Sequence, residues 1–435
     1  MTTPPQHVAE RYKLGLLACI HVVMCLVSLI SVAYYRNPAA FDPRTFHIFF
    51  DVSRLPLALV TAGAFALLVS LFAFVRFSFG YFVAFYAYTM VLSYLWLSNF
   101  TDLNYDHRLA GFSAAASAIA FMLPTLLISA PVPQVYALSE RTFDRLLLAI
   151  LLLSAAIVLV GASFNFQLVR VEDIYEFRDK IRLPTLLNYA IGMISSALLP
   201  FAFAGFVARK AKWRALAVLL LLLCLYPVTL TKLTLLAPFW LVAILILSRL
   251  FEARVAVMLS LLLPMSIALA LVVVLGERAA LLISTVNFRM IAIPAVAIDV
   301  YSDFFSRQPL THFCQIAFLK PLMNCPYQDM LAVVMEREYR IGNFNASLFA
   351  TEGIASVGFY LAPVAVLACG VILAIGNRVS ANLPPSFVMI SAALLPQVLL
   401  NVPLSTVLLT HGAGLLFLLW YITPRDIFFE KPKSA

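Results

Sequence analysis

The sequence predicts an all-α, polytopic membrane protein that forms one membrane domain over residues 1–435. Hydrophobic residues make up 63% of the chain and charged residues 12%, against about 25% in soluble domains. The mean hydropathy of +0.97 agrees with lipid as the main solvent. A spanning helix needs about 20 mostly apolar residues, and about twelve runs in the sequence meet that requirement. These runs lie near 14–34, 56–75, 80–100, 110–130, 146–163, 187–207, 215–231, 233–248, 255–275, 353–375, 385–402 and 405–421.

The first run and the longest apolar stretch need separate justification. The run at 14–34 is too long for the apolar part of a signal peptide and has no clear small-residue cleavage site, so we expect a retained helix. The stretch between Arg214 and Arg249 would be roughly 50 Å long as one straight helix, more than the hydrocarbon core requires. We therefore expect two spans that turn at YPVTLTKLT, residues 226–234.

The distribution of basic residues predicts the orientation in the membrane. The loop RKAKWR at 209–214 is the densest short basic loop, and such loops stay in the cytoplasm. Counting spans from this loop places both termini in the cytoplasm and two long loops, 164–186 and 276–352, outside. We expect the second loop to be folded, with short helices, because it carries many aromatic residues and is not low in complexity.

Residues 279–300 allow a second interpretation, as a further span. Arg289 would then lie at the middle of that span, at a cost of about 2.5–3.5 kcal/mol, and every later loop would change sides. We favour a helix that lies at the outer surface or dips into it.

Several classes of function have no support in the sequence. The six cysteines include no CxxC pair, and no HExxH motif or Gly-rich phosphate loop is found, so we expect neither a metal nor a cofactor. The net charge of +9 does not indicate a nucleic-acid partner, because the basic residues form short clusters between apolar runs. Cys314 and Cys325 are the only cysteines in an outer loop, where an oxidising compartment would allow a disulfide.

The predicted outer loops and turns place cationic side chains beside apolar ones. Arginine presents a planar fork that suits phosphate oxygens, and lysine binds phosphate as a point charge. A lipid with a diphosphate headgroup requires both features, since its tail stays in the bilayer. The alternative is that these are interface residues whose charged ends reach water. The candidate substrate-binding cations are Arg178, Arg182, Lys232, Arg289 and Arg307.

Residues 303–313, DFFSRQPLTHF, add candidate proton acceptors for a sugar hydroxyl. His312 can accept and donate a proton near neutral pH, although an ordinary exposed loop histidine is the alternative. Asp303 and Glu352 are rival bases. Asp303 could instead pair with Arg307, four residues later on the same helix face.

Two further polar residues stand next to or within apolar runs. Asn345 precedes the run at 353–375 and could hydrogen-bond sugar hydroxyls. His411 lies inside the last run, where we expect it to hydrogen-bond a neighbouring helix rather than to act in chemistry.

Two stretches resemble the O-antigen polymerases, which join oligosaccharide repeat units in bacterial inner membranes. GNFNASLFATEGIASVGFYLAPV, residues 342–364, resembles that family's Asn-rich entry followed by spaced glycines at the start of a late helix. TLTKLTLLAPFWLVAIL, residues 229–245, resembles its small-polar and cationic start of an apolar helix, with Lys232 where the family usually has arginine. The two basic outer loops also match the family's general plan.

This resemblance implies a GT-C-like membrane glycosyltransferase with its active site facing the periplasm. The growing glycan would pass from undecaprenyl pyrophosphate to the non-reducing end of a new lipid-linked unit, without a metal. Partners would be the undecaprenyl-pyrophosphate-linked oligosaccharide, membrane lipid and, as a candidate, a chain-length regulator protein. The roles follow the residue types: His312, Arg289 and Asp303 are the catalytic candidates, and the substrate-binding candidates are Arg178, Arg182, Lys232, Arg307, Asn345 and Glu352.

Three other functions remain open. An O-antigen ligase shares the plan of two outer loops and a basic site. A polyprenyl-phosphate-sugar glycosyltransferase tends to place a catalytic acid in its first outer loop, where Asp42 and Asp51 lie. A flippase or transporter of lipid-linked sugars would favour charges at mid-membrane and broken helices in paired halves, and the sequence has no evident internal repeat.

Overall fold

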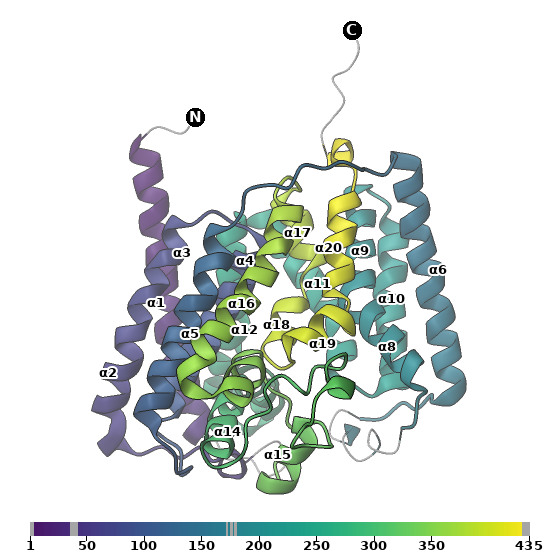
Figure 1. The fold of residues 1–435 in the computed structure, drawn as a ribbon. Coiled ribbons are helices and arrows are strands. Elements are labelled where there is room, and N and C mark those ends of the chain that lie inside the picture. Colours follow the sequence, from purple (N-terminus) through teal and green to yellow (C-terminus); the bar gives the residue numbers. More distant parts are fainter. Residues whose placement is uncertain (1–3, 35–41, 171–172, 175–176, 178–180, 429–435) are drawn as a thin grey trace. The chain divides into compact units, whose positions relative to one another are not determined.

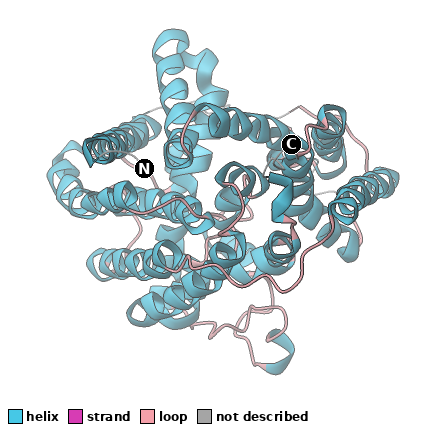
Figure 2. Cartoon of the chain, turned by 90° about the horizontal axis from the view of Figure 1, so that it is seen from above, coloured by secondary structure: helices cyan, strands magenta, loops and turns pink. Residues whose placement is uncertain are grey.

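The computed structural model describes residues 4–428 except 35–41, 171–172, 175–176 and 178–180. Regular structure within these residues is entirely helical (Figure 2). Within the described part of the chain, eleven helices are long and apolar enough to cross a membrane. They are Glu10–Tyr34, Val52–Phe74, Phe79–Leu97, His107–Leu127, Glu140–Phe164, Thr185–Ala208, Lys212–Thr229, Lys232–Leu250, Ala253–Leu275, Leu281–Arg307 and Phe349–Ser380. A polytopic membrane protein is therefore the class of this chain.

The prediction of two full spans at 385–402 and 405–421 is wrong. These runs form four short helices, of which the longest has 10 residues and is about 15 Å long. Pro403 and Gly412 stand between successive helices, and Gly412 has a left-handed backbone with φ +76°. The prediction failed because hydropathy depends on the apolar side chains and does not detect the breaks at Pro403 and Gly412. The four helices are α17 (Pro385–Ser391), α18 (Leu395–Leu399), α19 (Leu404–Leu409) and α20 (Ala413–Ile422).

The chain folds into two compact units. Unit 1 contains residues 1–128, 254–374 and 399–404, and unit 2 contains 129–253, 375–398 and 405–435. Each unit is thus assembled from segments far apart in the sequence.

Unit 1 is built around one completely buried helix. The helix α4 (Phe79–Leu97) packs against α5 (His107–Leu127), α2 (Leu55–Ala66) and α1 (Pro4–Tyr34). Polar pairs join α1 to α4 inside this apolar packing: His21 Nε2 lies 2.9 Å from Thr89 Oγ1, and Cys25 Sγ lies 3.4 Å from Ser93 Oγ. These pairs satisfy polar groups that lipid could not. The other long helices of unit 1 are α12 (Ala253–Leu275), α14 (Ile293–Arg307) and α16 (Ser356–Ser380), which ends in unit 2.

The segment Leu281–Arg307, where we favoured a helix at the outer surface over a further span, is one continuous helical stretch that includes a π-helix at Ser284–Ala292 before α14. It follows directly after α12, which runs parallel to α1: Glu10 pairs with Arg254 near the two helix starts. Its later part meets the loop between α4 and α5, where Asn104 N donates to Asp303. Both ends of the segment therefore lie at the same end of unit 1.

We call this end, with residues 42–54, 98–106 and 299–348, the loop end of unit 1. Figure 1 shows α14 and the short helix α15 (Leu331–Tyr339) here, opposite the start of α1. The segment 281–307 thus begins and ends at the loop end of unit 1.

Unit 2 contains α6 (Glu140–Phe164), α8 (Thr185–Met193), α9 (Leu199–Ala208), α10 (Lys212–Thr229) and α11 (Lys232–Leu250). A π-helix at Ile194–Leu198 joins α8 to α9 without a break. Arg209, between α9 and α10, pairs with Asp144 and Glu140 at the start of α6, and these pairs raise its pKa. The basic loop 209–214 thus lies at one end of unit 2, and the turn between α10 and α11 lies at the other.

The first long loop packs onto this second end. Asn165 Nδ2 donates to the carbonyl oxygens of Pro227 and Val228 at 3.1 and 2.9 Å. Ile174 forms a small apolar cluster with Tyr226 and Leu230. These contacts hold the described part of the loop 164–186 against the α10–α11 turn.

Candidate functional site

Unit 2 contains a pocket of about 330 Å³, which is within the size range of small-molecule sites. Four segments form it: the end of the loop 164–186, the α8 helix with its π-helical extension, the turn between α10 and α11, and the link between α19 and α20. The walls combine aliphatic groups with hydroxyls. The lining residues are Ile181, Leu183, Asn188, Ile191, Gly192, Ser195, Ser196, Thr229, Thr231, Leu233, Thr234 and His411.

Three threonines form a hydroxyl cluster on one wall of the pocket. Thr229 Oγ1 lies 3.0 Å from Thr234 Oγ1, and Thr231 Oγ1 lies 2.9 Å from the same atom. Thr231 also caps α11, because its hydroxyl accepts from Thr234 N at 3.3 Å. The cluster therefore places exchangeable hydroxyl groups at the positive end of a 19-residue helix, where anions are stabilised.

His411 also lines the pocket and stands in the interruption between α19 and α20. Its Nδ1 lies 3.3 Å from Ser196 Oγ on the π-helix, which is the interhelical hydrogen bond that the sequence predicted. Gly192 has no room for a side chain, since a Cβ there would lie 2.6 Å from the carbonyl oxygen of Thr410. A π-helix and a broken helix thus meet at the pocket, and both features occur often at functional sites.

Two of the predicted substrate-binding cations are direct sequence neighbours of residues that line this pocket. Lys232 is half-buried between two lining residues, Thr231 and Leu233. Arg182 is exposed between two others, Ile181 and Leu183. Arg178, the third cation assigned to this face, lies outside the described residues.

Asp303 and Arg307 form the helix-face pair that their spacing allowed, at the loop end of unit 1. The buried Asp303 carboxylate accepts from Arg307, from Tyr339 Oη at 2.6 Å and from Asn104 N at 3.2 Å. Burial and the bond to Asp303 raise the pKa of Tyr339, so the phenol remains a donor. These three donors already occupy the carboxylate that the sequence offered as a base.

The remaining predicted site residues of unit 1 are spread over separate segments. Arg289 is exposed on the π-helix 284–292, and Asn345 is exposed before α16. His312 is exposed in a left-handed backbone conformation with φ +47°. Glu352 is buried in a π-helix at Phe349–Ala355, and its carboxylate accepts from Thr351 Oγ1 at 2.6 Å.

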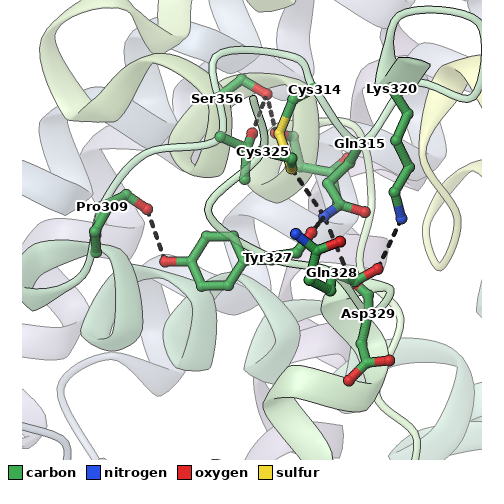
Figure 3. The surroundings of a disulfide bond; sticks show 11 residues. Pro309, Cys314, Gln315, Lys320, Cys325, Tyr327, Gln328, Asp329 and Ser356 are labelled. Carbon is green, nitrogen blue, oxygen red and sulfur yellow. Dashed lines mark hydrogen bonds between the residues drawn. A yellow bond between two sulfur atoms is a disulfide. The ribbon is translucent and has the colours of Figure 1, made fainter. Parts of the chain in front are cut away.

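A disulfide joins Cys314 to Cys325 in the loop end of unit 1, where the sequence allowed one (Figure 3). Gln315 crosses the closed loop and donates to the carbonyl oxygens of Tyr327 and Asp329 at 3.1 and 3.3 Å. Lys320 Nζ donates to the Gln328 carbonyl oxygen at 2.8 Å. The segment 314–329 is therefore cross-linked by polar contacts as well as by sulfur.

Sequence reasoning missed the hydroxyl groups of the pocket. The residues TLTKLT, 229–234, did indicate a small-polar stretch beside a cation, but Ser195 and Ser196 carried no local signal. Their role depends on the fold, which places the π-helix beside the interruption at His411.

Comparison with known protein families, with curated proteins and with solved structures finds no match. The chemistry of the site therefore rests on its own residues.

Proposed function

We propose that this chain is a membrane glycosyltransferase that polymerises lipid-linked oligosaccharide repeat units. It transfers the growing glycan from undecaprenyl pyrophosphate to the non-reducing end of a new lipid-linked unit. The resemblance of residues 229–245 and 342–364 to the O-antigen polymerases supports the reaction class. The pocket of unit 2 supports the type of substrate.

The observation that carries the proposal is the composition of this pocket. A polyprenyl diphosphate has a hydrophobic tail and a headgroup with several anionic oxygens. Aliphatic walls suit the first carbons of the tail, while the threonine hydroxyls and the start of α11 suit the oxygens. Lys232 and Arg182 add two positive charges beside the same pocket. Charge-assisted contacts of this kind are the strongest that a diphosphate can receive from a protein.

Two separate features support a periplasmic location, one for the pocket of unit 2 and one for the loop end of unit 1. In unit 2, the pocket lies at the end opposite the basic loop 209–214, which prefers the cytoplasm. In unit 1, the disulfide Cys314–Cys325 requires an oxidising compartment, such as the periplasm.

In the proposed reaction the diphosphate is the leaving group. Negative charge grows on the diphosphate oxygen bound to the anomeric carbon while the bond between these two atoms breaks. Lys232, Arg182 and the hydroxyl cluster would stabilise that charge more strongly in the transition state than in the ground state, which lowers the barrier.

Deleting the gene in its native host and examining the surface glycan by gel electrophoresis tests this function. Loss of the polymerase leaves a single repeat unit on the acceptor, and the wild-type gene restores the ladder of longer chains. An unchanged ladder would contradict the proposal. Long lipid-linked chains that never reach the acceptor would indicate a ligase instead.

A transporter of lipid-linked sugars is the second candidate, because the helix interruption at Thr410–Gly412 lies beside the pocket. Half-helices that end at a binding site are typical of transporters. Such a protein would leave repeat units on the cytoplasmic face after gene deletion. A polyprenyl-phosphate-sugar glycosyltransferase with Asp42 or Asp51 as its catalytic acid is less favoured. Both carboxylates cap short helices, because they accept hydrogen bonds from Arg44 N and Ser53 N.

A further inference from the structure

The pocket of unit 2 contains polar groups that the diphosphate does not require. The proposed function assigns the threonine cluster at the start of α11 to the diphosphate oxygens. Ser195, Ser196 and His411 line the same pocket and have no part in that assignment. We call these three residues the serine–histidine group. Ligand pockets contain few polar groups, and these fix the orientation and identity of the ligand, so this group is available for a second part of the same ligand.

Close backbone packing holds the serine–histidine group in place. A Cβ on Gly192 would lie 2.6 Å from the Thr410 carbonyl oxygen, and a Cβ on Gly412 would lie 3.1 Å from Ala197 Cβ. Gly412 also has a left-handed backbone, with φ +76°, which glycine adopts without strain. These two glycines allow the interruption between α19 and α20 to lie directly against the π-helix. The position of His411 is therefore fixed from both sides, which is what a preorganised site requires.

The Ser196 hydroxyl holds one nitrogen of the imidazole ring. Ser196 is fully buried, and its Oγ lies 3.3 Å from His411 Nδ1. Ser195 differs, because its hydroxyl donates to the Gly192 carbonyl oxygen at 3.2 Å, within its own helical stretch. His411 Nε2 has no hydrogen-bond partner within the described part of the chain. In either tautomer, Ser196 thus occupies one ring nitrogen and the other is left for a ligand.

The serine–histidine group carries no charge near neutral pH. Burial lowers the pKa of His411 below its usual value, so the imidazole is neutral. The serine hydroxyls are neutral as well, and none of the other described residues that line the pocket has an acidic or basic side chain. Anions gain most from charged donors, whereas a neutral imidazole and hydroxyls suit neutral hydroxyl or amide groups. The group therefore suits an uncharged polar ligand.

We propose that the serine–histidine group binds the first sugar of the donor, the one joined to the diphosphate, and that this sugar is uncharged. His411 Nε2 contacts a hydroxyl or acylamino group of the sugar, and Ser196 is the positioning residue for the imidazole. This inference rests on the proposed function, in which the threonine cluster holds the diphosphate. The first sugar is bonded to the diphosphate, so a pocket that holds one must have room for the other. All of these residues belong to unit 2.

The test compares the affinities of the purified chain in lipid nanodiscs for two lipids. One is undecaprenyl pyrophosphate, and the other is the lipid-linked repeat unit extracted from the gene-deletion strain. Binding is measured at low temperature, where gel electrophoresis confirms that the lipid-linked unit remains unreacted. We expect the wild type to bind the lipid-linked unit about tenfold more tightly, since one or two neutral hydrogen bonds contribute a difference of that order.

His411→Phe is the informative variant, because phenylalanine keeps a ring of similar size and removes both nitrogens. We expect this variant to bind undecaprenyl pyrophosphate as the wild type does and to lose the tenfold preference. His411→Gln should keep part of the preference, because its amide can take the place of Nε2. Thr231→Val should instead weaken the binding of both lipids, since each of them carries the diphosphate.

Ser196→Ala and Ser154→Ala form the matched pair. Both serines are fully buried, but Ser154 lies on α6 and is not among the residues that line the pocket. Ser196→Ala should lower the preference for the lipid-linked unit, because the imidazole loses the hydroxyl that positions it. Ser154→Ala should keep the preference of the wild type.

The contrary results separate this inference from the proposed function. Equal affinity of the wild type for the two lipids would overturn the sugar subsite and leave the diphosphate site intact. A tenfold preference that persists in His411→Phe would do the same. If His411→Phe weakens the binding of both lipids equally, the bond to Ser196 is only structural and the inference fails. Failure of the wild type to bind either lipid would overturn the proposed function, and this inference with it.

Discussion

At the scale of single residues, spacing along one helix predicted a contact that the fold contains. Asp303 and Arg307 are four residues apart and pair on one helix face. Tyr339 and Asn104 also donate hydrogen bonds to the Asp303 carboxylate. These two contacts could not be predicted, because the residues come from distant segments. A buried carboxylate with three donors is better suited to holding α14 against its neighbours than to accepting a proton from substrate. The contact between His47 Nδ1 and Asp102 Oδ1 could not be predicted for the same reason, since 55 residues separate the two.

Gly192 gives a prediction at this scale. A Cβ at this position would lie 2.6 Å from the Thr410 carbonyl oxygen, a backbone atom that cannot move aside cheaply. We expect Gly192→Ala to destabilise the protein by about 1–3 kcal/mol, the usual effect of overpacking. The measurement is the thermal unfolding midpoint in detergent.

The control is Gly63→Ala, at a helical glycine that has nothing within 4 Å of a Cβ. Its midpoint should stay the same or rise, because alanine is the better helix former. Equal midpoints for both variants would show that α8 packs less tightly against the Thr410 carbonyl oxygen than the distance of 2.6 Å implies.

At the scale of elements, hydropathy predicted most helices but not the breaks within them. The first nine predicted runs and the run at 353–375 each coincide with a long apolar helix. The runs at 385–402 and 405–421 are equally apolar, yet they form four short pieces. Composition alone cannot distinguish a spanning helix from a chain that turns inside the fold. The π-helix at Ile194–Leu198 was unpredictable in the same way, because it depends on packing rather than on residue type.

The start of α11 gives a prediction for this element. Thr231→Val removes both the helix cap and one hydroxyl of the pocket. We expect a loss of about 1 kcal/mol in the free energy of unfolding, together with weaker binding of undecaprenyl pyrophosphate. Thr231→Ser keeps the hydroxyl and should keep both properties. If the Thr231→Val and Thr231→Ser variants bind the lipid equally well, the hydroxyl of Thr231 has no part in recognising undecaprenyl pyrophosphate.

At the scale of the whole molecule, the separation of predicted site residues matters most. Lys232 and Arg182 belong to unit 2, whereas Arg289, Arg307 and His312 belong to unit 1. Sequence reasoning could indicate the cations and the loops, but it could not assign them to units that are assembled from distant segments.

The orientation of unit 2 gives a prediction for the whole molecule. In a background without Cys19 and Cys224, Arg182→Cys should react with a membrane-impermeant maleimide added to intact spheroplasts. Lys212→Cys, in the basic loop at the opposite end, should react only after permeabilisation. The reverse pattern would place the pocket on the cytoplasmic side and exclude a periplasmic polymerase.

The most direct test is the affinity of the purified chain in lipid nanodiscs for undecaprenyl pyrophosphate. We expect Lys232→Gln and Arg182→Gln each to weaken binding by about tenfold, since a charge-assisted contact contributes roughly 1.5 kcal/mol or more. Arg249→Gln, at the far end of α11, should bind as the wild type does. Wild-type affinity in the double variant of Lys232 and Arg182 would contradict a diphosphate site at this pocket.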